Sequence, residues 1–265
     1  RGARLVSSIY ERFRDSIRSE VPVALATLIE GSEVGAKLLI EESGTSFGSL
    51  GGEALDRVVS RDAIAMLEAG VSQVRHYGPE GEARQQELSV FIECHARRPH
   101  LVIFGAVDFT RALASQGKLL GFRVTVCDAR EVFATRRRFP MADEVVVDWP
   151  DRLLERVGKD LGPRDAVCVL THDAKFDVPA IVGALPTRVG YLGAMGSRKT
   201  HQKRVERLLE EGVTPLELER VRSPIGLDIG GRTPEETAVS IVAEIIALRT
   251  GRSAPSLSEG KGSIH

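Results

Sequence analysis

The sequence predicts an α/β protein: a smaller N-terminal α+β domain over residues 1–96, followed by a doubly wound parallel-sheet domain over 97–250. After residue 100, continuous apolar runs alternate with segments of helical periodicity, a pattern typical of strands covered by helices on both faces. The polar segment 94–99, which ends at Pro99, separates this region from the earlier, shorter runs. Residues 251–265 are rich in Gly and Ser, so we expect a disordered tail there.

The N-terminal domain is expected to begin with a helix, because Ile9, Phe13 and Ile17 recur at near-helical spacing. The elements that follow are two strands at 21–29 and 36–40, a flexible Gly-rich segment at 44–52, a helix at 53–68, and two further strands at 71–77 and 87–94.

The C-terminal domain is expected to alternate strands with helices. Its strands are the apolar runs at 101–104, 123–127, 144–147, 166–170 and 189–192, and its helices lie at 109–120, 152–157, 179–185, 199–209 and 235–248. The last helix has the clearest start, because Thr233 can cap it, Pro234 suits its first position and Glu236 its third.

Composition excludes several classes of protein. Hydrophobic residues make up 42% and charged residues 28% of the 265 residues, ordinary values for a globular chain. A net charge of −1 provides no global field for nucleic acid or an anionic membrane, so neither is an expected partner. The three cysteines lack the spacing of a zinc site or a disulfide framework, and no apolar stretch is long enough for a membrane span. We expect a cytoplasmic protein without a metal bound by its own side chains.

Candidate site residues lie in the loops after the strands, because open parallel sheets bind ligands at the carboxyl ends of their strands. After the first strand comes Gly105, but Val107 stands where a dinucleotide-binding turn needs glycine, and Asp108 would repel a phosphate. Asp128 follows the second strand at an offset suited to binding a ribose hydroxyl, and Arg130 is close by. NAD(P) binding and a purely structural turn both remain open.

The loop after the fourth strand contains Thr171, His172 and Asp173. His172 is a candidate acid or base near neutral pH, or alternatively a helix cap. Its position directly after a buried strand favours a functional role.

Glycines and cations follow the fifth strand as Gly193, Gly196, Ser197, Arg198 and Lys199. The two cations are expected in the first turn of a helix, where the helix dipole disfavours positive charge. A phosphate bound by main-chain N–H groups and these side chains would reverse that penalty. The alternative is that both cations point into water.

The Gly-rich connection 223–233 precedes the last helix and contains Asp228. This side chain either contributes to the site or forms an ion pair with Arg232.

Together these loops resemble the xanthine dehydrogenase accessory family of the XdhC/CoxI type, over nearly the whole chain. The motifs that carry the resemblance are Ala24-Leu25-Ala26-Thr27, Gly35-Ala36-Lys37, Gly48-Ser49-Leu50-Gly51-Gly52, Phe133-Ala134-Thr135-Arg136, Arg138-Phe139-Pro140, Ala142-Asp143-Glu144-Val145, Leu170-Thr171-His172-Asp173, Gly193-Ala194-Met195-Gly196-Ser197-Arg198, Ser223-Pro224-Ile225-Gly226-Leu227-Asp228-Ile229-Gly230 and Arg232-Thr233-Pro234-Glu235-Glu236.

The resemblance implies a Rossmann-like C-terminal domain in a protein that binds the molybdopterin form of molybdenum cofactor. Such a protein protects the cofactor, assists its sulfuration with a cysteine desulfurase, and delivers it to a molybdenum hydroxylase apoenzyme of xanthine dehydrogenase or CO dehydrogenase type. On this interpretation the chain is a chaperone more than an enzyme, and a homodimer is expected. Ser197, Arg198 and Lys199 would hold a phosphate. The pterin would be lined by Thr171, His172, Asp173 and Asp228.

Three departures from the family pattern limit this interpretation. Ala54 stands where many relatives have Cys or His, which argues against sulfur transfer through that position, and Glu53 adds a carboxylate. The segment 31–36 lacks the usual Arg. Val107 and Asp108 replace the Gly-His of the family's first turn.

Two alternatives remain. One is an NAD(P)-dependent oxidoreductase, in which Asp128 or Arg130 selects the cofactor and His172 serves as acid or base. The other is a nucleotide-responsive regulator without catalysis.

Overall fold

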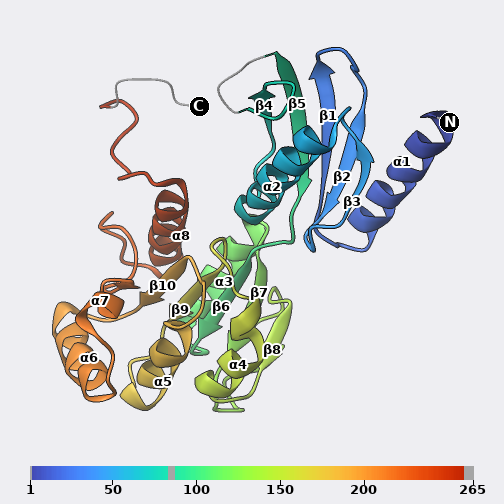
Figure 1. The fold of residues 1–265 in the computed structure, drawn as a ribbon. Coiled ribbons are helices and arrows are strands. Elements are labelled where there is room, and N and C mark those ends of the chain that lie inside the picture. The colour runs from blue at the N-terminus through green and yellow to red at the C-terminus, as the bar shows by residue number, and fades with distance from the viewer. Residues whose placement is uncertain (1, 83–86, 260–265) are drawn as a thin grey trace. The chain divides into compact units, whose positions relative to one another are not determined.

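The computed structural model describes residues 2–82 and 87–259. The chain divides into two compact units, one ending at Arg97 and the other beginning at Arg98 (Figure 1). The expected combination of an α+β unit and a parallel-sheet unit is confirmed. Of the expected tail, 251–259 contains neither helix nor strand, and 260–265 lies outside the described residues.

The N-terminal unit is an antiparallel sheet of strand order β3-β2-β1-β5-β4 with helices on both faces. Ile9 and Phe13 of the first helix pack on one face against Val23 and Leu39, whereas the second helix covers the face that includes Ala24. Neighbouring residues of one strand point to opposite faces, so the alternation explains the two cores. The elements are α1 (Gly2–Arg18), β1 (Val23–Glu30), β2 (Lys37–Glu41), β3 (Ser46–Ser49), α2 (Glu53–Ala69), β4 (Gln73–Tyr77) and β5 (Leu88–His95).

The flexible segment expected at 44–52 is wrong in part, because it contains β3. Phe47 pairs with Leu39 of β2 and packs against the core beneath α1, and the guanidinium of Arg12 lies 4.0 Å from the centre of its ring. One aromatic ring packed on the core and the pairing with β2 therefore order a sequence whose glycines predicted mobility.

The C-terminal unit is a parallel sheet of order β11-β10-β9-β6-β7-β8. The chain proceeds from β6 outward in one direction, then crosses back to β9, so the strand order reverses between β6 and β9. The elements are β6 (His100–Phe104), α3 (Asp108–Leu119), β7 (Arg123–Cys127), β8 (Glu144–Val146), α4 (Pro150–Val157), the 3-10 turn η1 (Gly158–Asp160), β9 (Ala166–Val169), α5 (Ala174–Ala184), β10 (Tyr191–Ala194), α6 (Arg198–Glu210), α7 (Pro215–Leu218), β11 (Val221–Arg222) and α8 (Pro234–Thr250).

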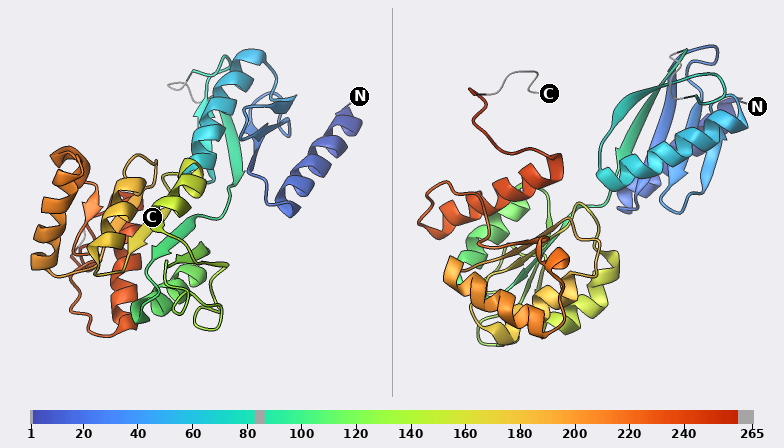
Figure 2. Two further views of the ribbon diagram at one scale, coloured as in Figure 1. Left: turned by 90° about the horizontal axis from the view of Figure 1, so that it is seen from below. Right: turned by 60° about the vertical axis from the view of Figure 1, so that its left-hand side comes forward.

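Helices cover both faces of this sheet (Figure 2). Leu113 of α3 and Ile241 of α8 join the core on one face, and Ile181 of α5 and Leu208 of α6 join the core on the other. This double coverage is why the strands are continuous apolar runs in the sequence.

Several elements of this unit differ from expectation. α5 begins at Ala174 instead of 179, because Asp173 caps it and Pro179 lies inside the helix instead of at its first position. β10 lies two residues later than the run that predicted it. β11 and α7 were not predicted, since two and four residues are too few to show a period.

Candidate functional site

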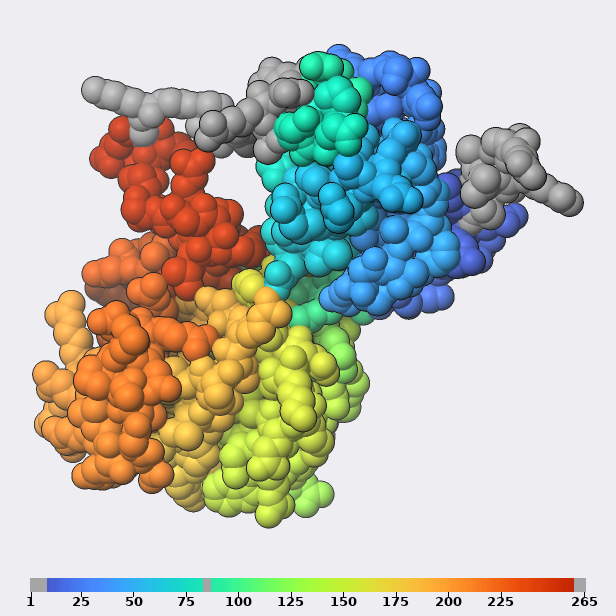
Figure 3. Space-filling view, viewed as in Figure 1, coloured from blue at the N-terminus to red at the C-terminus, as the bar shows by residue number. Residues whose placement is uncertain are grey.

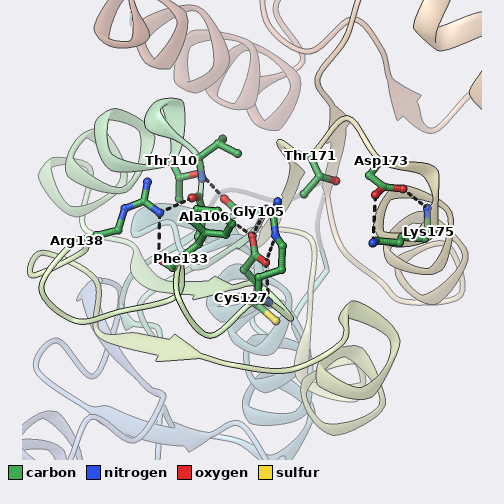
Figure 4. A network of polar contacts seen from close by, with 12 residues as sticks. Gly105, Ala106, Thr110, Cys127, Phe133, Arg138, Thr171, Asp173 and Lys175 are labelled. Carbon is green, nitrogen blue, oxygen red and sulfur yellow. Dashed lines mark hydrogen bonds and ion pairs between the residues drawn. The ribbon is translucent and has the colours of Figure 1, made fainter.

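The loops after β6 and β9 meet at the point where the strand order reverses (Figure 4). Gly105 has φ +105°, and a Cβ on it would lie 2.6 Å from Cγ2 of Thr171. The N–H of Leu170 also donates to the carbonyl of Phe104 at 2.8 Å. Both the positive φ and the close approach require glycine at 105. Two of the loops expected to contribute to the site, those after the first and fourth strands of this sheet, are therefore in direct contact.

Asp128, at the end of β7, is buried and fully engaged by protein donors. Its Oδ2 accepts from the N–H of Ala106 at 2.8 Å and from Nη2 of Arg130 at 2.7 Å. Its Oδ1 accepts from the main-chain N–H and from Nε of Arg130, each at 2.9 Å. Burial alone would raise the pKa of Asp128, but these hydrogen bonds outweigh it and hold that pKa below 3.8. A ribose hydroxyl would have to displace one of these donors.

The turn into α3 is closed by the chain itself. The hydroxyl of Thr110 donates to the carbonyl of Gly105, and Arg138 donates to the carbonyl of Ala106 at 2.9 Å. Asp108 stands in the first turn of α3 with its side chain 92% exposed, 3.7 Å from Arg138. A carboxylate already occupies the end of the helix that favours anions, so this turn disfavours a pyrophosphate.

Two of the residues after β9, Thr171 and Asp173, make hydrogen bonds within the fold, and the third, His172, is exposed. Asp173 is the N-cap of α5 and accepts from the N–H of Lys175 at 3.1 Å, so the alternative that His172 caps this helix is wrong. The hydroxyl of Thr171 is buried and donates to Asp177. His172 is exposed, and within the described residues its side chain makes no hydrogen bond.

A buried ion pair links three of the candidate loops, and sequence reasoning missed it. Asp177 accepts from Nη2 of Arg204 at 2.7 Å, and the two side chains are 4% and 3% exposed. Arg204 also donates to the carbonyl of Met195, after β10, at 2.7 Å and to Ser223, after β11, at 3.1 Å. Burial raises the pKa of Asp177, and the opposing effects of Thr171 and Arg204 do not cancel it.

A signal for this pair existed in the sequence. Arg204 lies on the stripe of α6 that includes His201 and Leu208, at a spacing where an apolar residue is expected. A cation on the buried stripe of a helix indicates an internal acidic partner. Asp177 lies outside the limits that the sequence predicted for α5, and this error hid the partner.

The loop after β10 presents main-chain donors and two cations at the start of α6. Ser197 caps the helix by accepting from the N–H of Thr200 at 3.2 Å. Arg198 and Lys199 are its first two residues, and both side chains are exposed. No described residue accepts a hydrogen bond from the main-chain N–H of Arg198 or Lys199. Gly196 passes closely over the helix start, where a Cβ would lie 3.1 Å from Cβ of Thr200.

The fifth candidate loop packs onto the sheet through Ile225. Gly193 lies under this loop, since a Cβ on it would lie 2.6 Å from Ile225. Asp228 is exposed, and the alternative of an ion pair with Arg232 is not found between these two described residues. The main-chain N–H of Arg232 instead donates to Glu236 at 2.7 Å.

The described part of the chain offers neither a metal site nor a membrane span. Within 2–82 and 87–259, no three side chains of His, Cys, Asp or Glu gather in a way that could hold a metal ion. None of the helices in that part of the chain has the length and apolar character needed to cross a bilayer. Cys94, Cys127 and Cys168 are free thiols.

The strand order and the arrangement of helices define a Rossmann-type domain joined to a small α+β unit. The chain belongs to the XdhC and CoxI family. The model of the XdhC Rossmann domain matches residues 101–245, and the model named XdhC and CoxI family matches residues 16–78.

Several known proteins are similar to this chain. A probable xanthine dehydrogenase component of Bacillus subtilis is 31% identical over 240 residues, which is 91% of this chain and 64% of that protein. The uncharacterized protein YqeB of Escherichia coli is 28% identical over 86% of this chain and 44% of its own length. The molybdenum cofactor insertion chaperone PaoD of Escherichia coli is 34% identical over 84 residues, 32% of this chain and 26% of that protein.

The chain spans less than two thirds of the length of each of these curated relatives. It also shares its fold with a crystal structure of a xanthine dehydrogenase from Bacillus halodurans. That match has a TM-score of 0.55 and 24% identity, and it covers 91% of this chain and 97% of the other.

Proposed function

We propose that this chain is a maturation factor for a molybdenum hydroxylase, which binds the molybdopterin form of molybdenum cofactor and delivers it to the apoenzyme. The observation that carries the proposal is membership of the XdhC and CoxI family together with similarity to a molybdenum cofactor insertion chaperone. The names of the relatives refer to xanthine dehydrogenase and to cofactor insertion, so a molybdenum enzyme is the natural client.

The chemistry of the sheet edge is compatible with this role. The cofactor bears a phosphate, and the start of α6 offers uncommitted N–H groups beside Arg198 and Lys199. Main-chain donors at a helix start attract an anion, and two cations in the same turn add to that attraction. Gly105 lies in the loop after β6, and Thr171, His172 and Asp173 lie in the loop after β9, with His172 exposed.

Metal and pterin analysis tests the proposal directly. The chain is purified without oxygen from cells able to make the cofactor, with PaoD as a positive control. We expect molybdenum and pterin to copurify in near-equal amounts. Absence of both from this chain, under conditions in which PaoD retains them, would contradict the proposal.

The double variant Arg198→Ala/Lys199→Ala should retain less cofactor. The loss should be larger at low ionic strength, because salt screens the attraction between exposed charges. Arg207→Ala, on the same helix away from its start, is the matched control and should behave as wild type.

The finer features of the role are also proposals. The cofactor receives its sulfido ligand from a cysteine desulfurase, without a sulfur carrier at Ala54. The protein acts in the cytoplasm as a homodimer, and its client is of xanthine dehydrogenase or CO dehydrogenase type. A desulfurase pull-down tests the source of the sulfur, and light scattering tests the homodimer.

An NAD(P)-dependent oxidoreductase is the second candidate, because the strand order is that of dinucleotide-binding domains. The engagement of Asp128 and the carboxylate of Asp108 in α3 weigh against it. Titration with NADH and NADPH separates the two candidates, and a saturable change with either would favour the oxidoreductase. Ligand-dependent partner binding without turnover would favour a regulator.

A further inference from the structure

Arg130 and three aromatic side chains form a row of neighbouring planar groups at the carboxyl edge of the parallel sheet. The guanidinium of Arg130 lies 4.5 Å from the ring centre of Phe133 and 5.6 Å from that of Phe176. The ring of Phe176 in turn lies 5.2 Å from the ring of Trp149, at an interplanar angle of 39°. We call Phe133, Arg130, Phe176 and Trp149 the stacking ladder. Arg130 and Phe133 follow β7, Trp149 follows β8, and Phe176 lies in the first turn of α5, within the yellow-green to gold part of the chain in Figure 3.

The two ends of the stacking ladder are open to solvent. Phe133 is 39% exposed and Trp149 is 40% exposed, whereas Phe176 between them is buried. Large aromatic side chains with this exposure at a ligand-binding edge leave ring surface available for a further planar group. Both ends of the ladder are therefore partly open to solvent, whereas Phe176 belongs to the packed interior.

Cations surround the ladder and remain available to an anion. Nε and Nη2 of Arg130 are committed to Asp128, but Nη1 makes no hydrogen bond to any described residue. Lys175 lies 4.8 Å from the ring centre of Phe176 and 3.5 Å from Asp173. Arg138 lies 5.6 Å from the ring centre of Phe133, and its Nη2 is 3.7 Å from Asp108. Asp173 lies at the limit of a hydrogen bond from Lys175, so a phosphate can compete for that cation, whereas the carboxylate of Asp108 disfavours a phosphate beside Arg138.

We infer that the stacking ladder binds a planar nitrogen heterocycle that carries a phosphate. The ring stacks on Phe133 or Trp149, and the phosphate accepts from Arg130 or Lys175. For the phosphate of the proposed cofactor, these cations are an alternative to the start of α6. Stacking on aromatic faces and on Arg recognises any such ring, because every heterocycle of this kind has a π face. Two sources share this chemistry: the pterin of the proposed cargo and the base of a nucleotide. This inference rests on the proposed function where the ligand is the pterin.

The chain contains its own reporter for the test. Trp149 is the single tryptophan in the sequence and stands at one end of the ladder, so its fluorescence reports a ring that stacks there. The full chain is titrated separately with neopterin phosphate, CMP, GMP and AMP, and free tryptophan amide serves as the absorption control. We expect saturable quenching in at least one arm, and the arm that responds identifies the source of the ring.

A matched pair of variants locates the binding. Phe133→Leu removes a ring from the ladder and should weaken binding by about tenfold. Phe91→Leu removes a similarly exposed ring, 36% exposed, from the N-terminal unit and should change nothing. Arg130→Lys keeps the charge but removes the planar group, and should also weaken binding, so the test does not depend on one variant. Thermal melting checks that each variant is folded.

Three results would overturn the inference: no saturable quenching with any of the four compounds, unchanged affinity in both Phe133→Leu and Arg130→Lys, or an equal loss in Phe91→Leu. If the chain copurifies with molybdenum and pterin but gives one of these results, the ladder is not the binding platform and the proposed function stands. If it neither copurifies with the cofactor nor binds neopterin phosphate, the proposed function fails as well. Saturable quenching by a nucleotide alone would then still support binding at the stacking ladder.

Discussion

Two Asp–Arg ion pairs lie at the carboxyl edge of the same sheet, and they differ in how much water reaches them. In the pair of Asp177 and Arg204 both side chains are nearly inaccessible, whereas Arg130, paired with Asp128, is 41% exposed. The pKa of Asp177 is raised by burial, and the pKa of Asp128 is lowered because hydrogen bonds from Arg130 and Ala106 outweigh its burial. The same residue types thus serve as an internal link on one side of the reversal point and as part of an accessible surface on the other.

The buried pair should give the largest effect. Arg204→Met leaves the carboxylate of Asp177 buried without a cation, and we expect a loss of about 3–5 kcal/mol in the free energy of unfolding. Urea unfolding followed by circular dichroism measures it. Arg207→Met, exposed on the same helix, is the control and should change stability by less than about 0.5 kcal/mol. A similar small change in Arg204→Met would show that the pair does not hold the loops.

The contact between Gly105 and Thr171 should give the next largest effect. Gly105→Ala introduces a methyl 2.6 Å from Cγ2 of Thr171 at φ +105°, and we expect a loss of about 2–3 kcal/mol. Gly121→Ala has a positive φ of 81° with nothing within 4 Å, so it isolates the backbone cost of about 1 kcal/mol. Thr171→Ser removes Cγ2 and should partly rescue Gly105→Ala. Equal losses in the two glycine variants would exclude a steric contact.

The pair of Asp128 and Arg130 should make a smaller contribution to the free energy of unfolding, and this contribution should depend on pH. Because the folded pKa of Asp128 is lowered, its ionised form stabilises the fold above pH 3.8, and that contribution is lost as the pH falls through the folded pKa. Asp128→Asn should cost about 1–2 kcal/mol at neutral pH and less as the solution is acidified. Urea unfolding at pH 7 and in acid measures the change. Asp151→Asn, exposed in α4, should show no such trend; a constant deficit for Asp128→Asn would contradict the assignment.

The cations at the start of α6 should give the smallest effect, with the opposite sign. Removing Arg198 or Lys199 relieves an unfavourable interaction with the helix dipole, so each Ala variant should gain about 0.3–1 kcal/mol in the absence of ligand. Arg207→Ala, in the last turn of α6, should instead lower the free energy of unfolding by about 0.3 kcal/mol, because a cation at this end of a helix is favourable. Thermal melting at low salt distinguishes the two. If Arg198→Ala and Lys199→Ala both lower the stability, these two cations make stabilising contacts of their own.

The sequence predicted most of the parallel sheet, because strands covered on both faces are apolar throughout and alternate with helical periods. It also predicted that the loops after β6, β7, β9 and β10 lie together, because the carboxyl ends of parallel strands share one edge of the sheet. It missed β3, where Phe47 orders a Gly-rich segment, and it placed the start of α5 too late. The late start removed Asp177 from consideration and, with it, the partner of Arg204.

The sequence by itself determined the family, the order of the strands' apolar runs and the loops that lie at the carboxyl edge of the sheet. Only the tertiary structure decided which polar side chains in those loops hold the fold together and which remain free to bind. The physical reason is that the hydrogen-bond partners of Asp128, Asp177 and Arg204 come from several elements, some far apart in the chain. Whether a charged group is satisfied internally or left to a ligand depends on those contacts and on the water around them, and neither is encoded in local spacing.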